Sequence, residues 1–361
     1  MTTDDLTPRI ATDPDHLGPE WLSDALAPRF GGGRVTGVAH EPVGTGQVGD
    51  AFRLRLTLEG APADAPTSLI AKLPAADPAS RAAGVAVRSY ELECRFYQQL
   101  ASDLPVRTPR CHLALFDPDT HDFTLIFEDL APAQQGDQIA GCSADEADLA
   151  LRELALLHGP RFGDPGLEAI SWLNRRGPED LAQLDAVATM VLPGFAERYG
   201  DRMGGELLGA YERLTERLTA YLDAAPRPFT ITHGDFRLDN LLFGVDGDRV
   251  GVVDFQGVAH GPGGSDRAYF LGGSPLPEVR RAHEGDLVAG YHCGLSAQGV
   301  EGYSLDDCWA AYRHGACAGM LVTLVASMLV EQTERGDEMF VAMGARHARH
   351  ALDLGTLERL G

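Results

Sequence analysis

Residues 233–240 have the sequence His-Gly-Asp-Phe-Arg-Leu-Asp-Asn, and residues 252–256 have the sequence Val-Val-Asp-Phe-Gln. Short apolar runs flank the first segment and begin the second, so we expect strands that deliver both segments to one cleft. A carboxylate at Asp235 can accept the proton of a hydroxyl group. Asn240 and Asp254 offer the oxygen ligands that Mg²⁺ prefers. The two segments therefore predict a site with one general base and one metal.

The order and spacing of these three residues are typical of a phosphoryl-transfer site, in which the later Asp holds metal ions that bridge the nucleotide phosphates. A polar hairpin that carries Asp and Asn by chance is the alternative, and the agreement of spacing, order and strand context disfavours it. Asp239 is the main alternative to Asp235 as the base, but its place directly before Asn240 favours a surface or substrate-facing role. We expect His233 to form hydrogen bonds within the loop.

A glycine-rich segment lies upstream, where Gly44, Gly46 and Gly49 separate strand patterns at 34–42 and 52–58. Such a loop lets backbone N–H groups approach phosphates without obstruction by side chains. A dinucleotide-binding loop would be followed by a helix, whereas strand, loop and strand in succession are the kinase arrangement. A hairpin without a ligand is the alternative.

Lys72 lies near the end of the apolar strand pattern 68–73. A lysine there can pair with the α- and β-phosphates of ATP when a glutamate holds it, although an edge-strand lysine is the commoner case. The helical pattern at 80–100 offers Glu91 and Glu93, and we favour Glu93.

Glu128 and Leu130 stand where the last strand pattern of the first lobe ends. In a kinase-like fold, backbone groups at this place meet the adenine. An ordinary strand end that turns into a connector predicts the same residues.

The composition is that of a globular protein: 361 residues, 44% hydrophobic, 23% charged, with a formal net charge of −23. This charge disfavours nucleic acid or an anionic membrane as a partner, because both need a basic face. It is compatible with a cationic or neutral substrate, but an acidic surface that only keeps the protein in solution is the favoured explanation. Six cysteines without a CxxC pair, and an N-terminus without a signal-peptide pattern, favour a cytoplasmic location.

Residues 1–130 contain mostly strand patterns, which include 111–116 and 123–128, with one prominent helix. Residues 131–361 are mostly helical and include a helical pattern at 144–158. We therefore expect two domains, a nucleotide-binding lobe at 1–130 and a catalytic and substrate-binding lobe at 131–361. The apolar stretch 316–330 is too short for a membrane span and predicts a buried helix. His347 and His350 resemble a solvated helical face.

These residues resemble the aminoglycoside phosphotransferase and choline kinase superfamily of small-molecule kinases, over most of the chain from Gly44 to Leu295. The amino-acid sequences of the motifs are most similar to those of the ecdysteroid kinase-like branch. The resemblance implies an α+β, protein-kinase-like fold with a sheet-rich N-lobe and a mostly helical C-lobe. It also implies ATP and Mg²⁺ as cofactors. The site residues that it implies are Asp235 as the catalytic base, Asn240 and Asp254 as metal ligands, and Lys72 with Glu93 as the clamp on the α- and β-phosphates.

Two departures from protein kinases bear on the substrate. Gly234 replaces the Arg of the His-Arg-Asp motif, and the short span from Asp254 to Asp266 leaves no room for an activation loop. We therefore expect phosphate transfer to a hydroxyl of a small molecule: an aminoglycoside or other antibiotic, a sterol or terpenoid alcohol, or a choline-like compound. An inactive nucleotide-binding regulator and a nucleotidyl transferase are the alternatives. We expect a monomer or homodimer.

Overall fold

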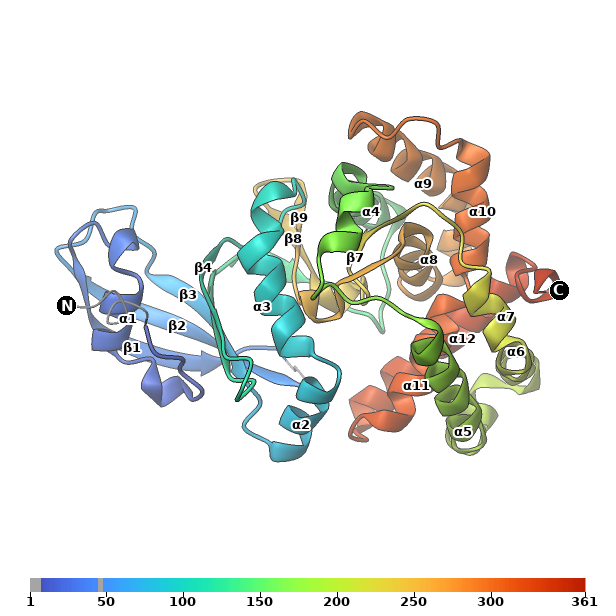
Figure 1. Ribbon diagram of the computed structural model, residues 1–361, viewed down its shortest axis with the longest axis horizontal. Coiled ribbons are helices and arrows are strands. Elements are labelled where there is room, and N and C mark those ends of the chain that lie inside the picture. Colours follow the sequence, from blue (N-terminus) through green and yellow to red (C-terminus); the bar gives the residue numbers. More distant parts are fainter. Residues whose placement is uncertain (1–7, 45–47, 361) are drawn as a thin grey trace. The chain divides into compact units, whose positions relative to one another are not determined.

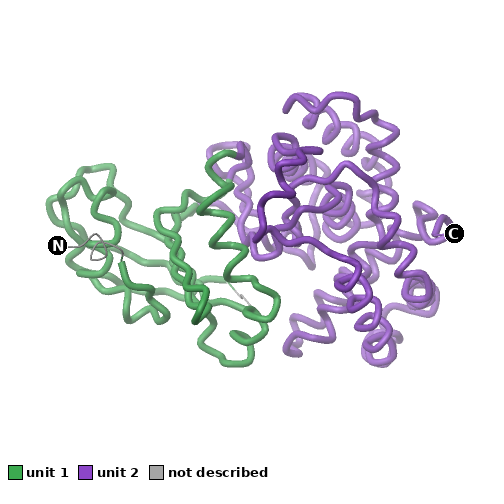
Figure 2. Tube along the Cα trace, viewed as in Figure 1, with its two compact units in different colours: residues 1–103, 108–131 green, residues 104–107, 132–361 purple. Residues whose placement is uncertain are grey.

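A computed structural model describes residues 8–44 and 48–360 of the chain. The chain divides into two compact units, coloured separately in Figure 2. The first unit comprises residues 1–103 and 108–131, and the second comprises residues 104–107 and 132–361. Residues 104–107, which the expected division placed in the first lobe, belong to the second unit.

Within its described residues, the first unit is built on an antiparallel sheet of five strands in the order β1-β2-β3-β5-β4, with three α-helices (Figure 1). Their bounds are β1 (Arg34–Pro42), β2 (Gly49–Glu59), β3 (Ser68–Pro74), β4 (Cys111–Phe116), β5 (Phe123–Glu128), α1 (Pro19–Ala25), α2 (Pro78–Ala86) and α3 (Ser89–Gln99).

The two faces of this sheet bury different sets of side chains because neighbouring residues of a strand point to opposite sides. On β3, Leu69, Ala71 and Leu73 join the apolar cluster that contains the residues of α1. Ile70 packs in the other cluster, with residues of α3 such as Tyr90. Lys72 has the same parity as Ile70, so the strand period directs its side chain to the α3 face.

The helical pattern at 80–100 predicted one helix, and this is wrong, since the structure has two. Arg88 adopts a left-handed backbone conformation with φ of 60° between α2 and α3, and an α-helix cannot continue through such a residue. The break lets α2 approach the ring of Tyr90 closely at Gly84, where a Cβ atom would lie 2.9 Å from the ring. Apolar spacing alone carries no signal for such a turn.

The second unit is mostly helical and contains short strands that carry the predicted motifs. The helices are α4 (Ala144–His158), α5 (Pro178–Met203), α6 (Gly205–Glu216), α7 (Leu218–Asp223), α8 (Gly263–Gly273), α9 (Pro277–Ala297), α10 (Leu305–Gly315), α11 (Ala318–Leu329) and α12 (Glu334–Asp353). The strands are β6 (Gln134–Gln135), β7 (Phe229–Thr232), β8 (Leu241–Val245), β9 (Arg249–Val252) and β10 (Ala259–Pro262). β7 pairs with β10, and β8 pairs with β6 and β9. The two units together confirm the α+β class.

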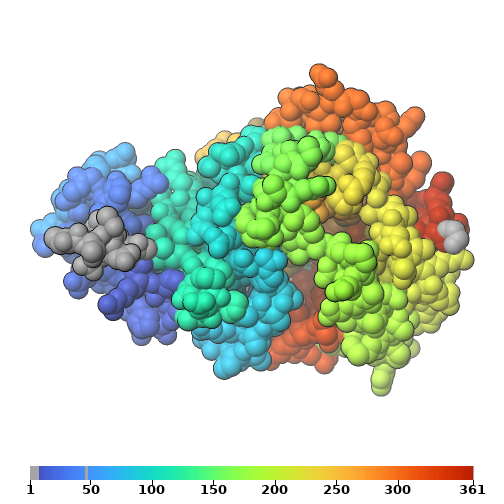
Figure 3. Space-filling view, viewed as in Figure 1, coloured from blue at the N-terminus to red at the C-terminus, as the bar shows by residue number. Residues whose placement is uncertain are grey.

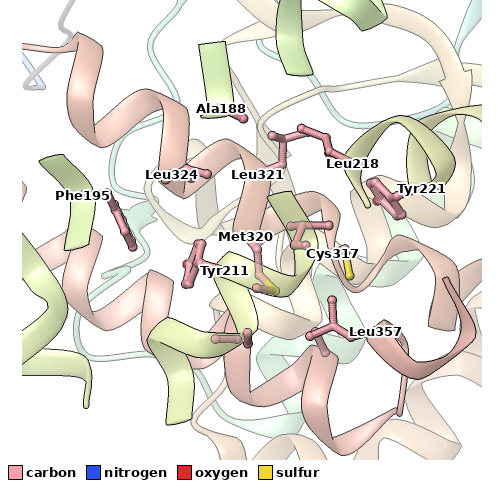
Figure 4. Packing of buried hydrophobic residues seen from close by; sticks show 14 of the residues in the cluster. Ala188, Phe195, Tyr211, Leu218, Tyr221, Cys317, Met320, Leu321, Leu324 and Leu357 are labelled. Carbon is pink, nitrogen blue, oxygen red and sulfur yellow. The ribbon is translucent and has the colours of Figure 1, made fainter. Parts of the chain in front are cut away.

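The core of the second unit lies among α5, α6, α11 and α12, and Figure 4 shows part of it. Phe195, Tyr211, Met320 and Leu324 are all at most 1% exposed in this cluster. The predicted buried helix at 316–330 is therefore confirmed as α11. Elsewhere in the unit α9 packs on α4, and the orange surface of α9 adjoins the green surface of α4 in the space-filling view (Figure 3).

Helix α8 is the central element of the second unit, because it contacts α10, α11, α12, α9, α4 and β7. Ten of its residues, Gly263, Gly264 and those from Asp266 to Gly273, are buried. None of the helices in the described part of the chain has the length and apolarity to cross a membrane.

His347 and His350 were expected on a solvated helical face, and this is wrong. Both are 0% exposed. The ring of His347 lies against backbone of α8 and α11, where Cβ atoms at Gly272, Gly273 and Gly319 would overlap it. Three glycines from two other helices make this space, and the local sequence around α12 does not reveal them.

Candidate active site

The catalytic loop, residues 233–240, leaves β7 and enters β8. Its tightest point is Gly234, which has a φ of +85°. A Cβ atom at this position would overlap the backbone oxygen of Gly257. An arginine cannot occupy such a position, which explains physically why this chain carries glycine where protein kinases carry Arg.

Asp266, on α8, holds the backbone of this loop. Its carboxylate accepts hydrogen bonds from the backbone N–H of His233 at 2.6 Å and from that of Gly234 at 3.1 Å. Helix α8 begins at Gly263, and Asp266 is its fourth residue, so Asp266 is not at the position of a helix cap. Its carboxylate instead braces the catalytic loop. Two charge-assisted hydrogen bonds to adjacent amides fix the path of the chain on entry to the loop.

His158, at the end of α4, supports Asp266 from behind. Its Nε2 lies 3.2 Å from the Asp266 carboxylate, and its Nδ1 lies 2.8 Å from the hydroxyl of Tyr291. Burial lowers the pKa of His158, against the effect of Asp266. The neutral tautomer with its proton on Nε2 therefore donates to Asp266 and accepts from Tyr291. His158 is 0% exposed, as expected for a core histidine.

His233 also forms hydrogen bonds within the loop, as predicted. Its Nε2 lies 2.9 Å from the backbone oxygen of Val253, and its Nδ1 accepts from the backbone N–H of Asp235 at 3.2 Å. One ring thus ties the catalytic loop to the residue directly before Asp254.

The Asp235 carboxylate receives hydrogen bonds at both oxygens. Oδ1 accepts from the hydroxyl of Tyr269 at 2.8 Å. Oδ2 accepts from Nε of Arg237 at 3.0 Å and from Nδ2 of Asn240 at 2.9 Å. Removal of water by the surrounding protein acts to raise the pKa of Asp235, but the charge of Arg237 and the hydrogen bond from Tyr269 outweigh it and hold the pKa below its usual value. The carboxylate is therefore ionised at neutral pH, while 36% of its side-chain surface stays exposed.

Asn240 and Asp254 lie at the same end of the β8–β9 hairpin. Leu241 pairs with Val252, and the backbone N–H of Val253 donates to the backbone oxygen of Asn240 at 3.1 Å. The Asn240 amide nitrogen is turned toward Asp235, which leaves the amide oxygen on the opposite side. Asp254 has a left-handed backbone conformation, with φ of 69°.

The chemistry of this pair suits Mg²⁺, because one or two protein oxygen ligands suffice when phosphates and waters complete the octahedron. Among the residues that the structure describes, no group of three or more His, Cys, Asp or Glu side chains could hold a metal ion. A cation at this hairpin would thus depend on Asn240, Asp254 and the phosphates of a nucleotide.

Asp239, the alternative base, has structural partners. Its carboxylate accepts from the backbone N–H of Gln138 at 3.2 Å and from Nη1 of Arg237. Gln138 also accepts from the backbone N–H of Leu238 at 2.9 Å. These contacts fasten the loop to the start of the second unit, so Asp239 does not have the open carboxylate expected of a substrate-facing residue.

The first unit contains the residues predicted to bind the nucleotide. Nζ of Lys72 lies 2.6 Å from Oε2 of Glu93, with both side chains largely buried. Glu91 instead pairs with Arg88 at 2.9 Å. The structure therefore pairs the favoured glutamate with the lysine, and the nucleotide-clamp role of the two stays a prediction.

The glycine segment joins β1 to β2, so the strand–loop–strand order is observed. Gly44 has a φ of +74°, and Gly49 begins β2. Gly46 lies outside the described residues.

Glu128 ends β5, where its carboxylate accepts from the backbone N–H of Arg110 at 3.0 Å, and Leu130 lies two residues further along the chain. The roles of these two residues toward a nucleotide also stay predictions.

Sequence reasoning missed Arg237 and Tyr269 as partners of the base. Arg237 lies inside the quoted motif, two residues after Asp235, and a cation beside a carboxylate was a usable signal. Tyr269 follows Asp266 by one helical turn, and residues so spaced share a helix face. If Asp266 is recognised as a residue that faces the catalytic loop, this spacing predicts that Tyr269 faces the same loop.

The sequence profile of the phosphotransferase enzyme family (APH) matches residues 46–299, more than half of the 361-residue chain. The comparison with curated proteins found no match. Among solved structures, the Plasmodium vivax ethanolamine kinase is similar with a TM-score of 0.53 and 12% identity, over 86% of this chain and 81% of that one. The gentamicin complex of APH(2″)-IIa is similar with a TM-score of 0.53 and 16% identity, over 95% of this chain and 99% of that one.

At these identities the two likenesses show the fold alone, and they confirm the kinase-like architecture. The ecdysteroid kinase-like branch is not among these findings and stays a prediction. The profile match, together with the arrangement of the catalytic loop, leads to one conclusion. The chain belongs to the phosphotransferase enzyme family and is a small-molecule kinase.

Proposed function

We propose that this kinase transfers the γ-phosphate of ATP to a hydroxyl group of a small molecule, with Asp235 as the general base. The observation that carries the proposal is the state of Asp235, a carboxylate that is ionised by its neighbours and yet 36% exposed. Such a group can meet an acceptor hydroxyl and take its proton. The acceptor oxygen then bonds to the γ-phosphorus as the bond between that phosphorus and the leaving ADP oxygen breaks.

The other predicted site residues would position the nucleotide and neutralise the charge of its phosphates. Asn240 and Asp254 would hold Mg²⁺, which would offset the negative charge that develops on the nucleotide phosphates. Lys72, held by Glu93, would pair with the α- and β-phosphates, and the backbone near Gly44 and Gly49 would lie over them. Orientation supplies most of the acceleration in such reactions, since phosphoryl transfer demands little covalent chemistry of the protein.

The acceptor class is supported by the family and by the charge of the chain. Ethanolamine and gentamicin, named with two proteins of similar fold, each combine hydroxyl and amine groups. A net charge of −23 suits a cationic acceptor, although solubility is the favoured explanation of this charge. We therefore consider aminoglycosides and choline-like amino alcohols to be candidate acceptors of equal standing with sterol and terpenoid alcohols. The latter are favoured by the resemblance of the motifs to the ecdysteroid kinase-like branch.

A screen of ATP consumption tests the proposal. Purified protein with ATP and Mg²⁺ is offered aminoglycosides, macrolides, sterols, choline and hydroxy acids, and products are weighed by mass spectrometry. The expected product carries one added phosphate and disappears with Asp235→Asn. Addition of AMP would instead indicate a nucleotidyl transferase, and nucleotide binding without any product would indicate an inactive regulator.

A further inference from the structure

Helix α8 presents two side chains to the catalytic loop from a single face. Asp266 and Tyr269 are three residues apart and so lie one above the other on the helix. Asp266 binds the backbone N–H groups of His233 and Gly234, while the hydroxyl of Tyr269 donates to Oδ1 of Asp235 at 2.8 Å. One rigid, buried helix therefore holds both the entry to the loop and the carboxylate that the loop delivers.

The ring of Tyr269 is itself held firmly. It is 5% exposed, and it stacks on the ring of His347 with centroids 5.2 Å apart and planes inclined by 6°. His347 has no room to move, because its ring packs on backbone at Gly273 and Gly319. Burial, followed by the charge of Asp235, raises the pKa of Tyr269 well above its ordinary value. The hydroxyl thus keeps its proton and acts as a donor.

The donors on the Asp235 carboxylate come from two different elements. Arg237 and Asn240, which bind Oδ2, belong to the same loop as Asp235 and move with it. Tyr269, which binds Oδ1, belongs to α8. Rotation of the carboxylate about χ2 would break contacts at both oxygens. Among the residues that the structure describes, Tyr269 is the one hydrogen-bond donor to this carboxylate that comes from outside the loop.

We propose that Tyr269 is a positioning residue for the general base, whose hydroxyl orients the Asp235 carboxylate toward the acceptor. The proposal rests on the proposed function of Asp235. A carboxylate oxygen accepts two hydrogen bonds. With one taken by Tyr269, the second lone pair of Oδ1 has a defined direction and is the one that meets the acceptor hydroxyl.

Loss of this hydroxyl has two effects that packing alone would not produce. A hydrogen bond to the ionised carboxylate favours that form, so Tyr269→Phe raises the pKa of Asp235 by about 1 unit. The acid limb of the kcat profile moves upward by the same amount. The plateau value of kcat falls by about 10- to 100-fold, the scale of a misplaced reacting group. KM for ATP changes by less than about twofold, because binding of the nucleotide does not use this contact.

The matched control is Tyr211→Phe. Tyr211 is also buried in the second unit, and its hydroxyl donates to the backbone oxygen of Gly344 at 3.1 Å. This variant loses the same atom at a distance from the catalytic loop. We expect its kcat profile to match that of the unmodified enzyme.

A second measurement keeps the test independent of the acceptor. Aspartate labelled with ¹³C at the carboxyl carbon is titrated by NMR, and the Asp235 signal is the one absent from Asp235→Asn. We expect it to titrate about 1 unit higher in Tyr269→Phe. An unchanged titration in a folded Tyr269→Phe protein would overturn the proposal.

A third variant decides the matter if Tyr269→Phe does not fold. 3-Fluorotyrosine introduced at position 269 alone has a more acidic phenol and donates more strongly, so the pKa of Asp235 should fall instead of rise. No change in either direction contradicts the proposal. If the NMR shifts occur as expected but Asp235→Asn retains full turnover, the hydrogen bond stands and the assignment of Asp235 as the base fails.

Discussion

At the scale of single residues, Asp235 combines an exposed edge with three hydrogen-bond donors. The donors lower the pKa of its carboxyl group, despite the loss of surrounding water. In the proposed role of Asp235 as the base, its low pKa makes it a weak proton acceptor in the ground state. It would therefore orient the hydroxyl and take the proton as the acceptor oxygen becomes acidic during transfer. This division of labour suits phosphoryl transfer, in which positioning dominates.

The first prediction concerns this base. Asp235→Asn should lower the rate of transfer by about 10²–10⁴-fold, the usual contribution of general-base catalysis. Affinity for the nucleotide should be retained. The check is single-turnover transfer together with calorimetric binding of ATP.

Asp239→Asn is the matched control for Asp235→Asn. It makes the same chemical change on a carboxylate that also binds Arg237, and we expect a much smaller loss of transfer. Equal losses in the two variants would show that only the Arg237 network, and not a base, had been probed.

The second prediction concerns the metal. Asp254 has a left-handed backbone conformation that Asn tolerates better than Ala, so the informative change is Asp254→Asn. Mg²⁺ should strengthen ATP binding to the unmodified protein and have little effect on the variant. Calorimetry with and without Mg²⁺ measures this difference, and Asp248→Asn, an exposed position in the turn of the same hairpin, is the control. A variant that still responds fully to Mg²⁺ would exclude Asp254 as a ligand.

At the scale of elements, close contacts at glycine set how helices of the second unit pack. In α9, Gly294 lies against α4, where an added Cβ atom would be 2.7 Å from the Cβ of Ala155. In the same helix, Gly285 has nothing within 4 Å of such an atom. Helix propensity treats the two positions alike, and tertiary packing separates them.

The third prediction uses this pair. Gly285→Ala should raise the free energy of unfolding by about 0.5–1 kcal/mol, because alanine is the better helix former. Gly294→Ala should lower it by about 1–3 kcal/mol, because α9 must move away from α4. Urea denaturation followed by circular dichroism measures both changes. Stabilisation by both substitutions would mean that the helices separate at little cost.

At the scale of the whole molecule, several histidines of the second unit are buried. His158, His347 and His350 are each 0% exposed. Burial lowers the pKa of all three, and for His347 burial and then Arg346 lower the pKa to about 3. Their protonation is thereby coupled to unfolding.

The fourth prediction is a loss of stability in mild acid. Below about pH 6.5 an unfolded chain protonates these histidines while the folded chain does not. The unfolded state then binds more protons, so the free energy of unfolding decreases as pH falls from about 6.5 toward the lowered pKa values. The carboxylates with lowered pKa, such as Asp353, add to this loss below about pH 5. The window from about pH 6.5 to 5 therefore reports mainly on the histidines.

Melting temperatures across that window measure the effect. His347→Phe keeps an aromatic ring beside Tyr269 but cannot titrate, so its melting temperature should depend less steeply on pH. His121→Asn, at an exposed position, should leave the slope unchanged. A melting temperature of the unmodified protein that is flat from about pH 6.5 to 5 would contradict the prediction.

Local sequence patterns were enough to predict most helices and strands and to identify the motif residues. The strands at 34–42 and 123–128 and the helix at 144–158 were predicted with the bounds observed, because apolar period and end signals agree there. At α4 the Ser143 side chain accepts from the N–H of Glu146, and Glu146 returns a bond, which is a capping box within four residues. Lys72 and Glu93 were paired by analogy with the kinase arrangement, and they form an ion pair.

By itself, then, the sequence determined which chemical groups are available for the proposed reaction. Side-chain type, spacing and strand context indicate which residues could accept a proton, hold a metal or leave room for phosphates. The tertiary structure alone decided how those groups are held. Tyr269 reaches Asp235 and His347 reaches Tyr269 from helices far along the chain, and Gly234 must be glycine because Gly257 passes beside it. Such contacts depend on the close packing of elements distant in sequence, and no local period or propensity carries that information.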